Sequence, residues 1–491
     1  TGHAALYAVD SEVARLGISV RDRVEAVALI HDGSRCLGVV ARCLRTGSHF
    51  AVMAKATVIA TGGYGRIYGQ YTSNATINEG TGASIALDTG IVPLGNMEAV
   101  QFHPTTLSPS GILVTEGCRG DGGYLLDKNL ERFMVEREPQ KQELASRDVV
   151  SRHMAQVMRD GDGVESPYGP HLWLDIRHLG EEHLRTKLLE VWDICRDFVG
   201  RNPAEELIPV RPTQHYSMGG IRVNKDGQAY GLGGLFAVGE AACWDMHGFN
   251  RLGGNSLAET LVSGRIVGCR VAEYASGSEL RADTGIALDA LKAAEQRAAA
   301  WLARSGNGPS VYEIRDAMGE TMMHKVGIFR TGDELTEAVA ELGQLLDDCD
   351  NAVLRSKDPG LNPELAFALR LRGMLRLAMT VAKGALARTE SRGAHFRSDY
   401  PVRNDRDWLN RTLVRWGMDE SAPTFSYEST GLIDLPPGHR GYGSDERIEM
   451  TTTLDEYNQN VLADQIRHGR LDSDEEMGSR LRRGAWKTAT G

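Results

Sequence analysis

Two short apolar segments, each running directly into glycines, constrain the fold of this chain more than any other feature. Residues 56–60 read Ala-Thr-Val-Ile-Ala and continue into Thr61-Gly-Gly63. Residues 235–238 read Leu-Phe-Ala-Val and continue into Gly239-Glu240. Buried parallel strands end in this way where a cofactor crosses their carboxyl ends. We therefore predict an α/β fold in which both strands meet at one edge of a cofactor-binding domain.

A third stretch, residues 245–259, places a cation, two glycines and a helix start side by side. Ser256 and Glu259 have the spacing of a capping box, so we predict that a helix begins near Ser256. The first amides of such a helix suit a flat, electron-rich group that lies against the glycines at 253–254. Arg251 stands just before them and is able to hold a carboxylate through two hydrogen bonds. The alternative is an ordinary loop with a surface arginine.

The composition argues against several classes of protein. Of the 491 residues, 41% are hydrophobic and 25% are charged, which is typical of a globular protein with several domains. The net charge of -11 argues against a nucleic-acid surface. No run approaches the roughly 18 apolar residues that cross a bilayer, so we expect no direct membrane span. The seven cysteines include no C-x-x-C pair, so we expect reduced thiols, a cytoplasmic setting, and neither a metal nor an iron–sulfur cluster in this chain.

The order of patterns along the chain predicts several parts. A helix over residues 4–16 leads into a meander of strands between residues 24 and 53. No G-x-G-x-x-G turn occurs, so either the start of a dinucleotide fold lies outside this sequence or no dinucleotide binds. A polar region with a helix over 142–158 follows the first half of the cofactor pattern. Long helices are predicted over residues 286–304, 311–325, 335–351 and 363–389, and an exposed charged tail after residue 472.

Side chains suited to a small ligand with two carboxylates occur in several separate stretches. Two histidines, a threonine hydroxyl and two arginines would complement such a ligand. Taken singly, each is better explained by a structural role, because buried histidines usually satisfy hydrogen bonds and surface ion pairs contribute little. The stretches are Gln101-Phe-His103-Pro-Thr105, Thr115-Glu116-Gly-Cys-Arg119, Ser146-Arg147-Asp148, Gln214-His215-Tyr-Ser-Met-Gly-Gly220 and Arg251.

Six stretches in order along the chain resemble the flavoprotein subunit of fumarate reductase and succinate dehydrogenase. Several ordered matches are far more specific than any single short motif. The six stretches are Ala60-Thr-Gly-Gly63, Gln101-Phe-His-Pro-Thr105, Ala145-Ser-Arg-Asp-Val-Val-Ser-Arg152, His215-Tyr-Ser-Met-Gly-Gly220, His247-Gly-Phe-Asn-Arg-Leu-Gly-Gly-Asn-Ser256 and Arg388-Thr-Glu-Ser-Arg-Gly-Ala-His395.

The resemblance implies an FAD enzyme that interconverts fumarate and succinate by hydride transfer between FAD N5 and the dicarboxylate. It implies that Arg147 is the proton donor or acceptor, with Glu116 and Arg119 as a proton relay behind it. The dicarboxylate is expected at His103, Thr115, His215 and Arg251. The FAD contacts are expected at Thr61, Gly62, Gly63, Glu240, Arg251, Asn255, Ser256 and Leu257. Departures from many relatives are Thr81, where they carry aspartate, and Phe249, where they carry alanine.

The resemblance also assigns the parts of the chain to domains. It implies that the pyrophosphate-binding glycines, and a histidine bonded covalently to FAD, belong to an amino-terminal segment absent from this sequence. The expected fold is α/β, with a partial Rossmann-like FAD-binding domain in residues 1–96 and 213–275, an inserted α+β capping domain in 97–212, a helical bundle in 276–412 and a small C-terminal domain in 413–491.

Partners follow from the same resemblance. An iron–sulfur subunit and a membrane cytochrome b or quinone-binding anchor subunit are implied. This chain would then be a peripheral subunit on the cytoplasmic face of the inner (cell) membrane. Two alternatives stay open. One is a flavoenzyme like L-aspartate oxidase, which resembles Arg-Leu-Ala-Ser-Asn-Ser where this chain has Arg251-Leu-Gly-Gly-Asn-Ser256. The other is an inactive binding or assembly remnant without FAD. Adenylylsulfate reductase is a more distant relative.

Overall fold

The two segments that end in glycines form a parallel pair of strands. β4 (Thr57–Ile59) pairs with β11 (Leu235–Ala237), and Ile59 lies opposite Ala237. Both strands therefore end at the same edge, where the chain continues into residues 61–63 and 239–241. The convergence predicted from the sequence is confirmed.

The computed structural model describes residues 2–281 and 283–430, which contain three further sheets. The predicted meander is the antiparallel sheet of β1 (Val24–His31), β2 (Cys36–Cys43) and β3 (His49–Met53). A five-stranded sheet has the order β12 (Ala242–Cys243), β10 (Gly220–Arg222), β5 (Leu94–Gly95), β13 (Asn410–Arg415) and β14 (Thr424–Ser429). The last sheet has the order β6 (Val100–Leu107), β9 (Ile208–Ser217), β8 (Leu172–Asp175) and β7 (Tyr124–Leu126).

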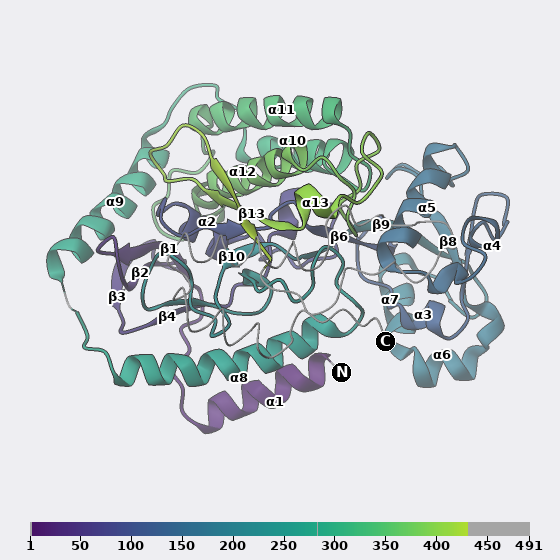
Figure 1. Ribbon diagram of the computed structural model, residues 1–491, viewed down its shortest axis with the longest axis horizontal. Coiled ribbons are helices and arrows are strands. Elements are labelled where there is room, and N and C mark those ends of the chain that lie inside the picture. Colours follow the sequence, from purple (N-terminus) through teal and green to yellow (C-terminus); the bar gives the residue numbers. More distant parts are fainter. Residues whose placement is uncertain (1, 282, 431–491) are drawn as a thin grey trace.

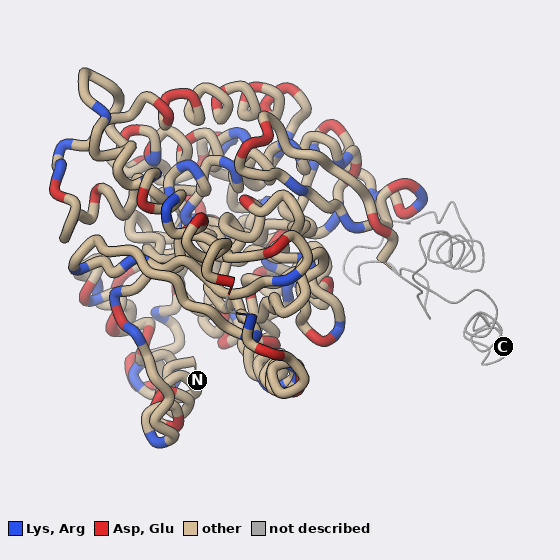
Figure 2. Tube along the Cα trace, turned by 90° about the vertical axis from the view of Figure 1, so that its left-hand side faces the viewer, with Lys and Arg blue, Asp and Glu red and all other residues tan. Residues whose placement is uncertain are grey.

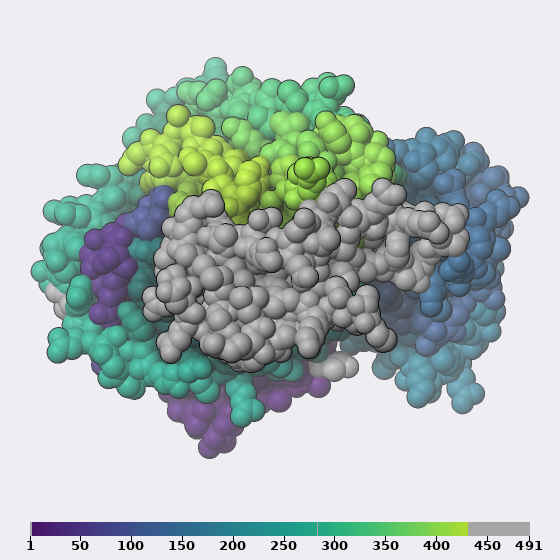
Figure 3. All heavy atoms as spheres, in the orientation of Figure 1, coloured from purple at the N-terminus to yellow at the C-terminus, as the bar shows by residue number. Residues whose placement is uncertain are grey.

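Residues 107–210 fold around a hydrophobic core of their own, and we call this part the lobe. The core contains Leu125 and Leu174 from the sheet and Val150 from α5 (Arg147–Arg159). The lobe lies to one side of the main body, as its blue colour shows in Figures 1 and 3. Its other helices are α3 (Gly117–Gly120), α4 (Met134–Arg137), η2 (Gln142–Leu144), η3 (Arg177–Leu179), α6 (Glu181–Lys187) and α7 (Leu189–Val199).

Four long helices pack together where the sequence predicts a helical bundle. α12 is buried along most of its length because apolar or small residues occupy nearly every face of it, among them Leu371, Leu375 and Ala378. The helices are α9 (Thr284–Ala303), α10 (Val311–Lys325), α11 (Gly332–Asn351) and α12 (Pro363–Ala387). The remaining helices of the main body are α1 (Gly2–Arg15), η1 (Gly65–Tyr68), α2 (Thr81–Leu87), η4 (Gly239–Ala241), α8 (Asn255–Ser276) and α13 (Asp405–Trp408).

The capping box predicted at the start of α8 is wrong. The helix begins at Asn255, its N-cap is Gly254 at φ +79°, and no side chain caps it. Glu259 is instead buried and accepts hydrogen bonds from Tyr216 Oη and His247 Nε2, both at 2.8 Å. A carboxylate satisfied by these two donors is not available to the helix N-terminus.

The predicted domain bounds stay predictions, although two facts bear on them. β13, which spans residue 413, pairs with β5, so the chain on both sides of that boundary shares a sheet with residues 94–95. Most of the predicted C-terminal domain, including the charged tail, lies outside the described residues. The fold class itself, a mixed α/β body with an α+β lobe and a helical bundle, is confirmed.

Three further features concern the distribution of charge, the state of the cysteines and the length of the apolar helices. Lys and Arg positions are interspersed with Asp and Glu positions along the described chain (Figure 2). The seven cysteines are free thiols, and five of them are buried. No helix in the described residues is long and apolar enough to cross a membrane.

Candidate functional site

Two histidines lie side by side on neighbouring strands. His103 on β6 and His215 on β9 have ring centroids 5.0 Å apart. His103 is fully buried, and its Nδ1 lies 3.2 Å from both the backbone N and the carbonyl oxygen of Thr105. Its Nε2 has no partner among the described residues. His215 Nδ1 lies 2.8 Å from Ser73 Oγ. The pair therefore offers a ligand a ring nitrogen that donates or accepts a hydrogen bond according to its tautomer.

Both histidines are neutral at neutral pH. Burial lowers the pKa of His103 well below its ordinary value, and His215 and Arg147 lower it further. Burial also lowers the pKa of His215 well below its ordinary value, with Arg251 as the next cause. Neutral imidazoles leave the positive charge of the site to its arginines.

Arg147, the first residue of α5, is joined to Glu116. Its Nε and Nη2 both donate to Glu116 Oε2, at 3.0 and 2.8 Å, while its buried Nη1 has no partner in the described part of the chain. The other oxygen, Glu116 Oε1, lies 3.4 Å from Arg119 Nη2. Burial alone would raise the pKa of Glu116, but Arg147 and Arg119 outweigh it and the pKa is lowered. The predicted relay residues are thus in direct contact.

Arg251 is buried in the loop before α8. Its guanidinium carbon lies 4.7 Å from the centroid of the Tyr216 ring, and its carbonyl oxygen accepts a hydrogen bond from Gln101 Nε2 at 2.7 Å. Burial lowers the pKa of Arg251 to about 10, with Arg147 as the second cause, so the side chain is still charged at neutral pH. Its Nη1 donates to the Leu252 carbonyl oxygen at 3.3 Å, while its Nε has no partner within the described ranges. Because a buried charge without a counter-charge is costly, the place favours an anion.

Gly253 brings the Arg251 loop against the relay residues. A Cβ at this position would lie 3.0 Å from Glu116 Oε2 and 3.5 Å from Arg147 Nη2. The loop before α8 and the lobe therefore meet at the site. Thr115 is exposed beside Glu116, and its Oγ1 accepts a hydrogen bond from Gly117 N at 3.2 Å. No hydrogen bond among the described residues joins Thr115 to the histidines or to Arg251.

The residues predicted to contact FAD form two groups that adjoin each other. Gly62 has φ +72°, and Gly63 lies so close to Glu240 that a Cβ would collide with that carboxyl group. Burial raises the pKa of Glu240 to about 7, and its Oε1 accepts a hydrogen bond from Ser217 N at 2.8 Å. η4, which contains Glu240, contacts α8. The first group is Thr61, Gly62, Gly63 and Glu240, and the second is Asn255, Ser256 and Leu257.

These two groups fit a flavin. The start of α8 has no side-chain cap and its residues from 253 to 255 are exposed, so its first amides face outward as donors. At the neighbouring edge Thr61 is exposed and Gly62 is half-buried, so a flat ring system can approach the backbone there, whereas Gly63 is packed against Glu240. Among the described residues, no group of three or more His, Cys, Asp or Glu side chains is arranged to hold a metal ion.

The sequence interpretation missed a buried group beneath Arg251. Tyr216, whose ring lies under the Arg251 guanidinium, shares the Glu259 carboxylate with His247. A signal is present in the sequence, because Glu259 is an acidic residue on a helix with many apolar residues, but its spacing from Ser256 predicts a cap.

Comparison with known proteins shows the family of the chain. Residues 1–257 match the family model described as the FAD binding domain, and residues 315–442 match that of the fumarate reductase flavoprotein C-terminus. The fumarate reductase flavoprotein subunit of Helicobacter pylori is 46% identical over 473 residues, which cover 90% of this chain. The succinate dehydrogenase flavoprotein subunit of Rickettsia bellii is 38% identical, and the match covers 90% of this chain and 76% of that protein.

A solved structure leads to the same family. The quinol fumarate reductase of E. coli matches with a TM-score of 0.81 at 36% identity, covering 85% of this chain and 73% of that chain. The chain spans only 66% of the length of the Helicobacter relative. The resemblance found in the sequence is confirmed by these matches, which together extend over most of the chain. The chain belongs to the family of fumarate reductase and succinate dehydrogenase flavoprotein subunits.

Proposed function

We propose that this chain carries the active site of an FAD enzyme that interconverts fumarate and succinate. The observation that supports it best is that three buried nitrogens without partners in the described residues, His103 Nε2, Arg147 Nη1 and Arg251 Nε, belong to neighbouring side chains. They lie so close that both arginines lower the pKa of His103 and Arg147 lowers the pKa of Arg251. A polar ligand bound among these side chains would give these nitrogens partners. Two cations and two neutral histidines complement a small dicarboxylate.

In this proposal FAD is held by Thr61, Gly62, Gly63 and Glu240 at the strand edge and by Asn255, Ser256 and Leu257 at the start of α8. The chemistry that FAD would supply there, when bound and reduced, is hydride transfer to one alkene carbon of fumarate. A covalent bond between FAD and a histidine outside this sequence is part of the same proposal.

The side chains of this chain bind the substrate and move the proton. Arg251, His103 and His215 hold the carboxylates, with Thr115 at the rim, and stabilise the negative charge that develops as the alkene is reduced. Arg147 gives a proton to the carbon that does not receive the hydride, and succinate forms. Arg147 then regains a proton by way of Glu116, to which it is directly hydrogen-bonded, and Glu116 receives that proton from Arg119, the next member of the relay. The reverse steps oxidise succinate.

The proposed partners are an iron–sulfur subunit and a membrane cytochrome b or quinone-binding anchor subunit. The names of the relatives support this, because they are subunits and one solved neighbour is a quinol fumarate reductase. This chain would be the peripheral subunit on the cytoplasmic face of the membrane.

Replacement of Arg147 tests the proposal. We expect Arg147→Ala to lower kcat for fumarate reduction by about a thousandfold, the usual size of a lost general acid, because alanine has no proton to donate. The measurement is fumarate-dependent oxidation of a reduced viologen by the flavin-loaded protein, with turnover expressed per bound flavin. The control is Arg137→Ala, because Arg137 is exposed on the lobe surface, where it pairs with Asp160 at 3.2 Å. Normal turnover in Arg147→Ala would exclude the proton-transfer role.

A further inference from the structure

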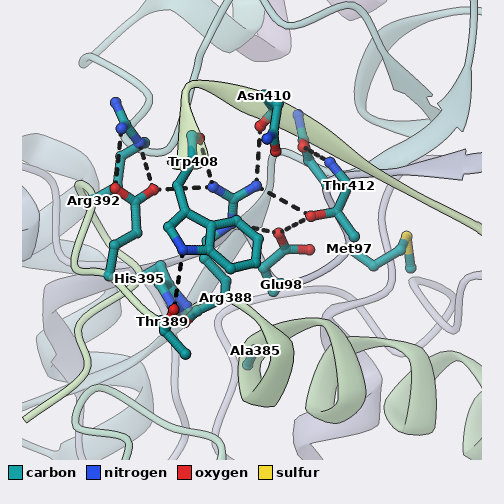
Figure 4. Close-up of polar contacts among 12 residues, drawn as sticks. Met97, Glu98, Ala385, Arg388, Thr389, Arg392, His395, Trp408, Asn410 and Thr412 are labelled. Carbon is teal, nitrogen blue, oxygen red and sulfur yellow. Dashed lines mark hydrogen bonds and ion pairs between the residues drawn. The ribbon is translucent and has the colours of Figure 1, made fainter. Parts of the chain in front are cut away.

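A buried cluster of ion pairs surrounds Arg388, in the segment 388–396 that adjoins the site (Figure 4). Arg388 and Glu98 are both fully buried and form an ion pair at 2.9 Å. A second ion pair joins Arg388 to Glu390 at 3.0 Å. The remaining donors of Arg388 bond to the carbonyl oxygens of Trp408 and Asn410 and to the Thr412 hydroxyl, at 3.0 to 3.1 Å. A guanidinium satisfied on every side fixes its segment firmly.

One face of this segment supports the loop that carries Arg251. The Arg388 guanidinium lies 4.7 Å over the ring of Phe249, and Ala394 N donates to the Phe249 carbonyl oxygen at 2.7 Å. Gly393 has φ +56°, and a Cβ there would lie 2.5 Å from the same carbonyl oxygen. Only glycine permits this approach. Phe249 is two residues before Arg251, so the cluster fixes the loop close to its functional side chain.

Another face of the same segment contacts the lobe helix that carries Arg147. Arg152 Nη1 donates to the Gly393 carbonyl oxygen at 3.2 Å and to Asp148 Oδ2 at 2.9 Å. Its guanidinium carbon lies 5.0 Å from the centroid of the Phe396 ring. Arg152 is five residues after Arg147 on α5, so the two side chains move together with this rigid helix.

We propose that Arg152 is a positioning residue, which locks α5 onto the segment 388–396 and so sets Arg147 relative to Arg251. This inference rests on the proposed function, since it concerns the same substrate. Gly393 contacts both the main-body loop at 249–251 and, through Arg152, the lobe helix. The positions of the loop and of the helix are therefore set against the same residue. A donor displaced by about 1 Å can lose roughly a hundredfold in rate, so a contact at a distance from the substrate is able to govern turnover.

Substitution of Arg152 separates positioning from stability. We expect Arg152→Gln to lower kcat per bound flavin for fumarate reduction at least tenfold, to change KM less than threefold, and to leave the shape of the pH profile unchanged. Arg152→Lys keeps one charged donor for Gly393 and should restore part of the lost kcat. Hydrogen exchange at the Ala394 amide should become faster in Arg152→Gln, because the segment loses its contact with the lobe.

The control is Arg159→Gln on the same helix, since the Arg159 guanidinium lies 4.5 Å over Phe329 instead. It should keep wild-type kcat and exchange. If Arg152→Gln keeps kcat within twofold of wild type, or only lowers the melting temperature, the positioning role is wrong. If the wild-type protein itself does not reduce fumarate, the proposed function fails, and hydrogen exchange alone still decides whether Arg152 holds the segment in place.

Discussion

Unpaired donors and neutral histidines are the residue-scale features of this site. Among the buried polar atoms that lack a partner within the described residues, three belong to His103, Arg147 and Arg251, which come from different elements of the fold. The sequence indicated which residue types would be present. It did not indicate that burial lowers the pKa of His103 and leaves the positive charge to Arg147 and Arg251. That follows only from packing.

Another buried histidine gives a prediction for stability at acid pH. His395 is fully buried, and its Nδ1 accepts a hydrogen bond from Arg330 Nη1 at 2.7 Å. Burial lowers its pKa well below the ordinary value, and Arg330 and Arg388 lower it further. Below pH ~6.5 the unfolded chain protonates this histidine but the folded chain does not. As the pH is lowered below ~6.5, this group should therefore decrease the free energy of unfolding by roughly 1.4 kcal/mol for each pH unit.

Urea unfolding between pH 7 and pH 5 checks this expectation. Glutamine does not titrate, so the free energy of unfolding of His395→Gln should fall less steeply as the pH is lowered. The difference in slope should be about that of one bound proton, roughly 1.4 kcal/mol per pH unit. Its stability at pH 7 will also change, which is why the slope is compared. Parallel slopes in both proteins would contradict the account.

At the scale of elements, helix existence followed from periodicity, whereas helix ends and contacts did not. α10 begins and ends where the pattern predicts, because its start is a true capping box of Ser310 and Glu313. α8 begins one residue before the predicted Ser256 and has no side-chain cap, because Glu259 accepts hydrogen bonds from buried donors instead. The same spacing of residues thus had two outcomes, and tertiary contacts decided between them.

Two helix glycines should respond in opposite directions to alanine. A Cβ at Gly343 on α11 would meet no atom within 4 Å, so Gly343→Ala should raise the free energy of unfolding by about 0.5–1 kcal/mol. A Cβ at Gly319 on α10 would lie 2.8 Å from Gly69 Cα, a backbone atom beside η1. Gly319→Ala should therefore lower it by about 1–3 kcal/mol. Thermal unfolding followed by circular dichroism measures both, and shifts of equal sign would show that the packing of α10 on η1 is wrong.

At the scale of the whole molecule, the sequence predicted the parts better than their assembly. Glycine-terminated strands and four periodic helices carry local signals, and both appear as predicted. The pairing of β13 with β5 carries no such signal, since β5 has only two residues and its partner lies over 300 positions away. The cluster around Arg388 was visible only as a family motif, and its contacts with Phe249 and Arg152 depend on the assembled fold.

The central claim is that this assembly exchanges electrons between FAD and a four-carbon dicarboxylate. The most direct test is the flavin absorbance of the oxidised, flavin-loaded protein under anaerobic conditions after succinate or L-aspartate is added. Succinate should bleach the flavin and L-aspartate should not. Bleaching by L-aspartate instead would indicate that the chain oxidises L-aspartate, as an aspartate oxidase does. A bound flavin that responds to neither compound, nor to fumarate once chemically reduced, would contradict the account.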